Sequence, residues 1–115
     1  MRVLVCGGRD YDDGDRVDDV LTDIRIEFGP ITMLIQGGAD GADGLAAEWA
    51  ERNGVPYLTV PANWKAHGNA AGPIRNAAML THLPELVVAF PGGKGTANMV
   101  AQAKEKGVRV EEISP

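Results

Sequence analysis

Short apolar segments alternate along this chain with longer segments in which apolar residues recur at helical spacing. Arg2–Cys6 is apolar and β-branched, which is typical of a buried strand, and Val17, Leu21 and Ile24 then recur three and four residues apart, as on one face of a helix. The predicted strands are 2–6, 32–36, 56–60, 85–90 and 108–113, and the predicted helices are 15–28, 44–52, 73–82 and 96–106. A longer loop is expected over 61–71.

This strict alternation of strands and helices determines the expected fold class. Continuous apolar strands separated by helices are typical of a parallel sheet covered on both faces. We therefore expect an α/β, Rossmann-like three-layer sandwich with a five-stranded parallel sheet in the order 3-2-1-4-5. The last strand should lie at an edge because its residues alternate apolar and acidic. At 115 residues the chain is expected to form a single domain, 1–115.

Glycine-rich loops follow the first, second and fourth predicted strands, at 7–10, 37–43 and 91–96. The carboxyl ends of parallel strands share one edge of the sheet, and the reversal of strand order between strands one and four is a usual ligand position. Backbone N–H groups at a helix N-terminus suit phosphate. One such loop alone is often only a tight turn, but three at one edge predict a phosphate site.

Two common nucleotide motifs are not met. A Walker loop requires Ser or Thr after its lysine, but Lys94 is followed by Gly95, and the glycine that should precede the spacer is absent at Val88 and Ala89. The dinucleotide fingerprint needs a third glycine where Asn98 stands. Neither an ordinary NTPase nor an ordinary NAD enzyme is supported, and no cofactor is expected.

Three basic residues, Arg9, Arg75 and Lys94, fall on the predicted ligand edge. Arg75 is expected in the first turn of its helix, where a cation opposes the helix dipole and a bound phosphate or carboxylate would compensate it. The alternative for Arg75 is a salt bridge to Asp10, Asp40 or Asp43. Arg9 and Lys94 have the alternative of being solvated.

Acidic residues provide candidates for a general base or a ribose ligand. Asp10, Asp43 and Glu48 are the catalytic candidates, with Asp40 beside them. Their structural alternatives are capping of the second helix by Asp40 or Asp43 and a solvent-facing place for Glu48. A further cluster, Asp12, Asp13 and Asp15, is expected to cap the first helix, and we expect no metal site.

The predicted loop 61–71 contains Trp64 and His67, which are candidates for stacking on a base and for bonding a phosphate. The alternative for Trp64 is that it only packs the loop down. Trp49 is expected in the core or at an oligomer contact. Cys6, the only cysteine, is expected as a buried thiol.

Net charge and hydropathy restrict the partners. The net charge of −5 opposes general binding to nucleic acid. No apolar stretch approaches the ~20 residues that span a bilayer, and we expect no leader sequence before the first strand. A soluble, cytoplasmic protein with no membrane partner is therefore expected.

Four segments together resemble a known superfamily: GGRDYDD, LIQGGADGADGLAAEWA, NWKAHGNAAGPIRNAAML and VVAFPGGKGT. They are similar to the YspA/cpYpsA-related (YAcAr) branch of the SLOG superfamily over nearly the whole chain. The wider signature is an Arg-Asn pair, here Arg75 and Asn76, upstream of a strand that ends in Pro-Gly-Gly-x-Gly-Thr. It is shared with the Lonely guy (lysine decarboxylase-like) phosphoribohydrolases and with DprA.

The resemblance implies a Rossmann-like domain for a nucleotide or nucleotide-derived ligand, and related folds are commonly homodimers or higher homo-oligomers. In the phosphoribohydrolases a glutamate follows the loop and serves glycosidic-bond cleavage; Met99 stands there in this chain. A sensor or binding domain is thus favoured, the alternatives being a hydrolase with a different acid and an interaction module with a vestigial pocket. The expected ligand-binding residues are Gly7, Gly8, Arg9, Gly37, Gly38, Asp43, Trp64, His67, Arg75, Asn76, Pro91, Gly92, Gly93, Lys94, Gly95 and Thr96.

Overall fold

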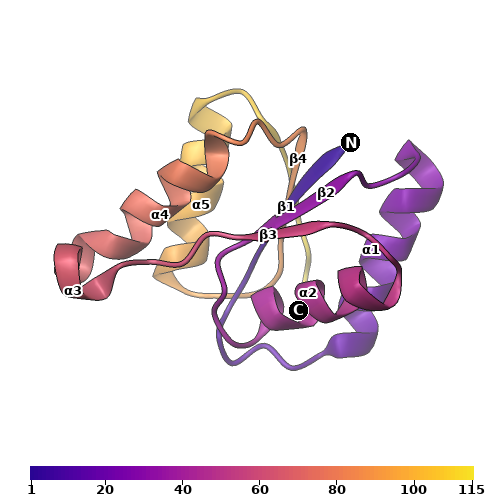
Figure 1. Ribbon diagram of the computed structural model, residues 1–115, viewed down its shortest axis with the longest axis horizontal. Helices are drawn as coiled ribbons and strands as arrows, with labels where there is room; N and C mark the ends of the chain where they lie inside the picture. Colours follow the sequence, from indigo (N-terminus) through magenta and orange to yellow (C-terminus); the bar gives the residue numbers. More distant parts are fainter.

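The computed structural model describes all 115 residues and contains one five-stranded sheet between two pairs of helices (Figure 1). All four strand pairings are parallel and the strand order is β3-β2-β1-β4-β5, as the sequence predicts. The strands are β1 (Arg2–Cys6), β2 (Met33–Gln36), β3 (Tyr57–Thr59), β4 (Leu86–Ala89) and β5 (Arg109–Glu112). The helices are α1 (Gly14–Phe28), α2 (Ala42–Arg52), α3 (Trp64–His67), α4 (Ala71–Leu80) and α5 (Lys94–Glu105), with a 3-10 turn at Gly68–Ala70.

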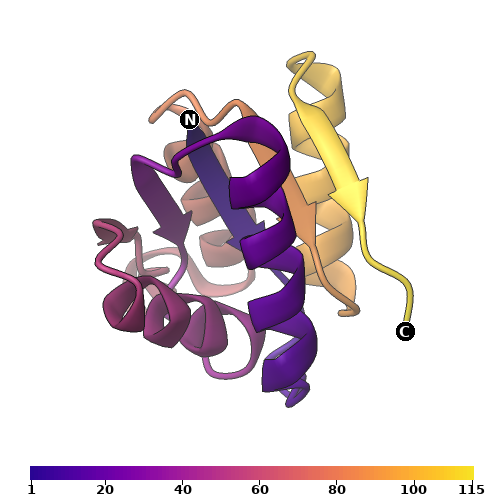
Figure 2. The ribbon, with the colours of Figure 1, turned by 90° about the vertical axis from the view of Figure 1, so that its right-hand side faces the viewer.

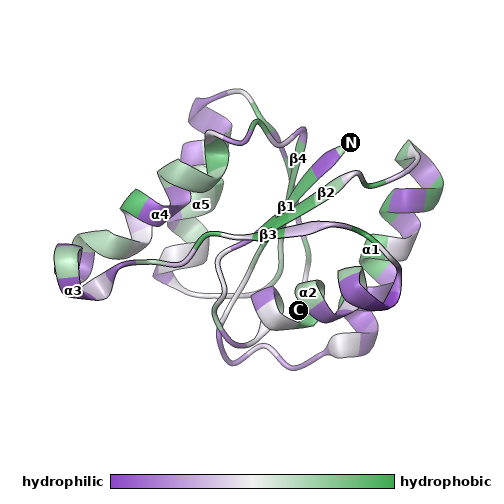
Figure 3. Cartoon of the chain, in the orientation of Figure 1, coloured by the Kyte–Doolittle hydropathy of each residue, from purple (hydrophilic) through white to green (hydrophobic).

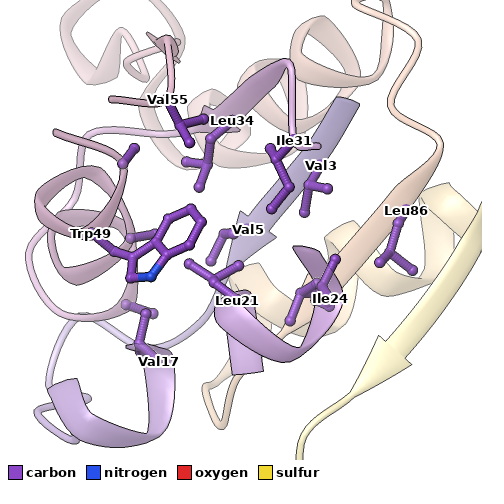
Figure 4. Close-up of a cluster of buried hydrophobic side chains, with 14 of the residues drawn as sticks. Val3, Val5, Val17, Leu21, Ile24, Ile31, Leu34, Trp49, Val55 and Leu86 are labelled. Carbon is purple, nitrogen blue, oxygen red and sulfur yellow. The ribbon is translucent and has the colours of Figure 1, made fainter. Parts of the chain in front are cut away.

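Alternate residues of the central strands face opposite helix layers. On one face, Val3 and Val5 pack with α1 and α2 around the buried indole of Trp49 (Figure 4). On the other face, Leu4 and Cys6 pack with residues of α4 and α5. Because β1 is buried on both sides, its sequence reads as a continuous apolar run. The apolar strands at the centre and the more polar outer surfaces of the helices are visible in Figure 3.

The two edge strands are less buried than the three central strands. β5 lies at one edge beside β4, as its alternating sequence predicts, and β3 lies at the other (Figure 2). None of the helices combines the length and the apolarity that a bilayer crossing requires.

The largest difference from the sequence prediction lies between β3 and α4. The predicted loop 61–71 contains the short helix α3, whose N-cap Asn63 accepts a hydrogen bond from the Ala66 N–H at 3.0 Å. Helix α4 begins at Ala71, so Pro73 is its third residue and not its first. Proline is tolerated there because N–H groups of the first turn have no partner within the helix.

Candidate ligand-binding cleft

The loops that follow β1, β2 and β4 are hydrogen-bonded to one another at the carboxyl edge of the sheet. Gly8 is the common member: its N–H donates to the Pro91 carbonyl at 2.9 Å, and its carbonyl accepts from the Ala42 N–H at 3.2 Å. The three loops that the sequence places at this edge therefore meet at Gly8.

Close packing accounts for several of the loop glycines. A Cβ on Gly7 would overlap the Ala42 side chain, and a Cβ on Gly92 would overlap the Thr96 hydroxyl and approach the Gly8 backbone. These glycines allow the loops to approach one another and need no ligand to explain them.

Gly93 and Gly95 differ from those glycines. A Cβ on either residue would meet no protein atom within 4 Å, and neither has a positive φ. Both line the cleft: Gly93 is the N-cap of α5, and Gly95 lies in its first turn, where glycine lowers helix stability relative to alanine. Loop packing accounts for neither glycine, and the helical backbone of Gly95 would accept alanine.

The cleft itself has a volume of about 650 Å³, within the range of small-molecule sites. Thirteen of the sixteen expected ligand-binding residues line it: Gly7, Gly8, Arg9, Asp43, Trp64, Arg75, Asn76, Pro91, Gly92, Gly93, Lys94, Gly95 and Thr96. The remaining lining residues are Cys6, Asp10, Tyr11, Ala39, Gly72 and Met79.

A second cavity of about 340 Å³ adjoins the cleft and contains Gly37 and Gly38. Two candidates line neither cavity: His67, which is exposed in α3, and Glu48, which is exposed in α2. Glu48 thus has the solvent-facing place that was its structural alternative.

Arg75 is the cation most firmly held in the cleft. Its Nη1 donates to the Gly37 carbonyl at 3.0 Å and its Nε donates to Asn76 Oδ1 at 3.1 Å. It is the fifth residue of α4, so the prediction that it lies in the first turn is wrong, and the helix dipole gives no argument for an anion there. No carboxylate forms an ion pair with it, so the salt-bridge alternative is also wrong.

Asn76 joins Arg75 to the loop that follows β4. Its side chain is 3% exposed, and its Nδ2 donates to the Gly95 carbonyl and to Asn98 Oδ1, both at 3.1 Å. Asn98 Oδ1 also accepts from Gln102 Nε2 at 2.7 Å. This chain of amides fixes the position of α4 relative to α5, and with it the distance between Arg75 and the glycine loop.

Asp43 is the only buried carboxylate of the cleft, with 6% exposure. Burial raises the pKa of this carboxyl above its ordinary value of 3.8, while the N–H of Ala39, at 3.2 Å, and the charge of Arg75 oppose that rise. The N-cap of α2 is Gly41, with no side-chain cap, so the capping alternative for Asp40 and Asp43 is wrong. Asp43 instead holds the loop that precedes the helix.

The other acids near this edge are exposed. Asp10 lines the cleft and Asp40 lines the second cavity, and neither makes a side-chain hydrogen bond or an ion pair within the chain. Asp13 caps α1 by accepting from the Arg16 N–H at 3.0 Å, as predicted for the acidic cluster there.

Cys6, which lines the cleft, and Met99 belong to the same apolar cluster. Burial raises the pKa of the Cys6 thiol to about 12, so this thiol stays protonated and unreactive at neutral pH. Met99 is fully buried and does not line the cleft.

Sequence reasoning missed the amide partners Asn98 and Gln102 and the cleft-lining Met79. The signal for the first two was present, since 98 and 102 lie one helical turn apart on α5. Nothing in the sequence pairs them with Asn76 on another helix.

The structure defines a Rossmann-like α/β protein with a cleft at the carboxyl edge of its sheet. The model of the YspA, cpYpsA-related SLOG family (YAcAr) matches residues 1–67, more than half of the chain, and the chain belongs to this family. Gene 61 protein of Mycobacterium phage D29 is 35% identical over 118 residues, covering 95% of this chain and 93% of that protein.

Two solved structures share the fold. DNA processing protein A (DprA) from Streptococcus pneumoniae superposes with a TM-score of 0.78 at 20% identity, covering 99% of this chain and 50% of that chain. TM1055, a structural genomics target, superposes with a TM-score of 0.71 at 19% identity, covering 96% of this chain and 72% of that chain. The chain thus spans half the length of the DprA chain, and at these identities the likeness concerns the fold.

Proposed function

We propose that this protein binds a nucleotide or nucleotide-derived ligand in the cleft, with a phosphate on the loop 91–96, and acts as a sensor or binding domain. The observation that carries the proposal is the open space beside Gly93 and Gly95. A ligand that approaches the backbone closely supplies a reason for two glycines that the protein's own packing does not require. The N–H groups of the first turn of α5 then face the phosphate.

The charges around the cleft support an anionic ligand. Arg9, Arg75 and Lys94 line it, and none of them forms an ion pair within the chain. The cleft lining carries these three cations against two carboxylates, Asp10 and Asp43, whereas the protein as a whole carries a net charge of −5. The cleft is therefore more positive than the rest of the protein.

Aromatic side chains support a base. Trp64 is 54% exposed and lines the cleft, so its indole is accessible to a ligand there. Tyr11, also in the cleft lining, stacks against Phe90 with ring centroids 5.4 Å apart. Either ring is available to contact a nucleobase.

Glycosidic-bond hydrolysis is the second candidate, favoured by one observation. Asp43 is a buried carboxyl with a raised pKa beside Arg75, which is a suitable environment for a general acid. Release of free base from a nucleoside monophosphate, lost in Asp43→Asn and kept in Asp10→Asn, would support it. Absence of free base over a day at high enzyme concentration would leave binding as the function.

Calorimetric titration of the full chain with AMP, GMP, CMP, UMP and ADP, compared in wild type and Gly95→Ala, tests the proposal. The added methyl group would occupy the open space, so we expect at least about a tenfold loss of nucleotide affinity. The same substitution should raise the free energy of unfolding by up to about 1 kcal/mol, because alanine favours helix over glycine.

Gly44→Ala is the matched control. Gly44 also lies in the first turn of a helix, its Cβ would make only an ordinary contact, and it lines neither cavity. It should gain similar stability and leave affinity unchanged. If no nucleotide binds wild type at millimolar concentration, or if both alanine variants bind as wild type does, the proposed phosphate position is wrong.

A further inference from the structure

The segment 61–70, which connects β3 to α4, contributes no buried residue to the fold. Ala62 is half-buried and all the other residues of the segment are exposed. Helix α3 within it is a single turn, and a helix of four residues is not stable through its own hydrogen bonds. Figure 1 shows α3 at the periphery of the molecule, at the end of α4. Burial of apolar surface therefore does little to hold this segment in place.

Hydrogen bonds anchor the segment only at its two ends. Before it, the Val60 N–H donates to the Gln36 carbonyl at 2.9 Å, and after it the buried Ala71 begins α4. Between these ends the hydrogen bonds stay within the segment or join it to the start of α4, as when Asn63 Oδ1 accepts from the Ala66 N–H. A segment bonded in this way can open at low cost in free energy while the rest of the fold stays intact.

Gly68 provides a hinge where α3 ends. Its φ is +54°, a conformation that residues with a side chain rarely adopt, and a Cβ there would meet no protein atom within 4 Å. The backbone conformation therefore requires this glycine, and packing does not. Positions that absorb changes in φ and ψ at the ends of short elements are those about which loops close over ligands.

Trp64 connects the segment to the candidate site. Its half-exposed indole borders both the cleft and the second cavity, whereas residues 65–70 line neither of them. A ligand in the cleft gains contact with the indole only while the segment lies against the cleft. Binding and the position of the segment are therefore coupled.

We infer that the segment 61–70 is a lid, which opens and closes independently of the rest of the fold and which a nucleotide in the cleft holds closed through Trp64. This inference rests on the proposed function, since it assumes that a nucleotide occupies the cleft. Ordering the lid costs conformational entropy. The affinity for the nucleotide should therefore depend on lid residues that do not touch it.

Hydrogen exchange of single backbone amides, followed by NMR on the full chain with and without saturating AMP, tests the lid. Without AMP, we expect the amides of Ala66, His67 and Gly68 to exchange within about tenfold of the rate of an unfolded chain, although each donates a hydrogen bond. AMP should slow these three amides at least about tenfold, together with amides of the loop 91–96. Because the three residues line neither cavity, their slower exchange reports closure and not contact with AMP.

Trp64→Ala removes the side chain through which AMP holds the lid. In this variant saturating AMP should still slow exchange in the loop 91–96, but it should leave the amides of residues 66–68 as fast as they are without ligand. Slower exchange at 66–68 in Trp64→Ala would contradict the role given to the indole.

Two matched substitutions separate the lid from an ordinary helix. Ala66 in α3 and Ala101 in α5 are both exposed and line neither cavity. Ala66→Gly should weaken AMP binding about fivefold and leave the urea midpoint unchanged, because glycine disfavours only the closed state of the lid. Ala101→Gly should lower the urea midpoint and leave AMP affinity unchanged, because α5 is part of the cooperative fold.

The outcomes also separate the lid from the proposed function. If AMP slows exchange in the loop 91–96 but not at residues 66–68, nucleotide binding stands and the lid is wrong. If residues 66–68 exchange as slowly as β1 without AMP, the segment is part of the rigid fold and the lid is wrong whatever AMP does. If AMP slows no amide, the proposed function fails and the lid fails with it.

Discussion

Arg75 Nη1 donates to the carbonyl oxygen of Gly37 across the carboxyl edge of the sheet, at 3.0 Å. A Cβ on Gly37 would overlap this guanidinium and lie 3.1 Å from Asp43 Oδ2. Gly37 has no positive φ, so its backbone would accept other residues. Glycine is needed here because the Arg75 side chain lies against the backbone of Gly37. Gly37 thereby helps to determine the position of the Arg75 guanidinium.

Gly37→Ala should therefore displace the Arg75 side chain. The overlap involves the end of a flexible side chain, so we expect a loss of about 1 kcal/mol in unfolding free energy, but a loss of nucleotide affinity of about tenfold. Urea denaturation and calorimetric titration measure the two effects.

A double-mutant cycle with Arg75→Gln provides the control. If Gly37→Ala acts through the arginine, its effect on affinity should nearly vanish in the Arg75→Gln background. Full additivity of the two losses would show that Gly37 affects the ligand by another route.

The fold could be predicted because the information lies in local apolar patterns. Val3 and Val5 face one helix layer while Leu4 and Cys6 face the other, and such two-sided burial appears in the sequence as a continuous apolar run. The family and the fold expected from the four motifs are confirmed. Helix α3 was missed because four residues are too few to show a period.

The site could be predicted only in part, since strand order brings loops together but does not determine which side chains bond. The meeting of Gly8 with the loops after β2 and β4 follows from the strand order. The bond from Arg75 to the Gly37 carbonyl does not, because it depends on α4 beginning at Ala71 and on the path of a long side chain. The binding roles of the cleft residues stay predictions.

Asn76→Leu should destabilise the protein as well as weaken binding. The substitution removes the side-chain donor to the Gly95 carbonyl and one of the two donors to Asn98 Oδ1, and it leaves Arg75 Nε without its acceptor. We expect the free energy of unfolding to fall by about 2 kcal/mol or more. Gln102→Ala, which removes the partly exposed outer member of the amide chain, should cost less than about 1 kcal/mol. Equal losses in urea denaturation would contradict a central role for Asn76.

Asp43 should make the unliganded protein less stable as pH rises through the titration of its carboxyl. Burial raises the folded-state pKa above the ordinary 3.8, so in that window the folded state binds the proton more tightly than the unfolded state. The contribution of Asp43 to the free energy of unfolding is fully present below about pH 3.8, and it is lost as the pH rises through the folded-state pKa. Asp43→Asn lacks this dependence.

Urea denaturation of both proteins from pH 3 to pH 8 measures that effect. The difference in unfolding free energy should shift in favour of Asp43→Asn with rising pH and become constant above the folded pKa. Because Asn keeps an oxygen that can accept from the Ala39 N–H, the loop is preserved in the variant. A difference that shifts toward the wild type over that range would mean that the carboxylate is stabilised and not strained by its surroundings.

Met99→Glu would place the glutamate of the related phosphoribohydrolases at its position in this chain, and we expect it to destabilise the protein without creating a hydrolase. Met99 is fully buried in the cluster with Cys6 and Met79, and it does not line the cleft. A carboxyl introduced there meets apolar neighbours, so we expect a loss of about 3 kcal/mol or more in unfolding free energy at neutral pH, less at pH 4 where the acid is neutral. Met99→Leu, which conserves volume, should cost under about 1.5 kcal/mol. A Met99→Glu variant that was as stable as wild type and released free base from AMP would contradict this expectation. It would mean that the side chain at position 99 reaches the ligand and is not buried in the active protein.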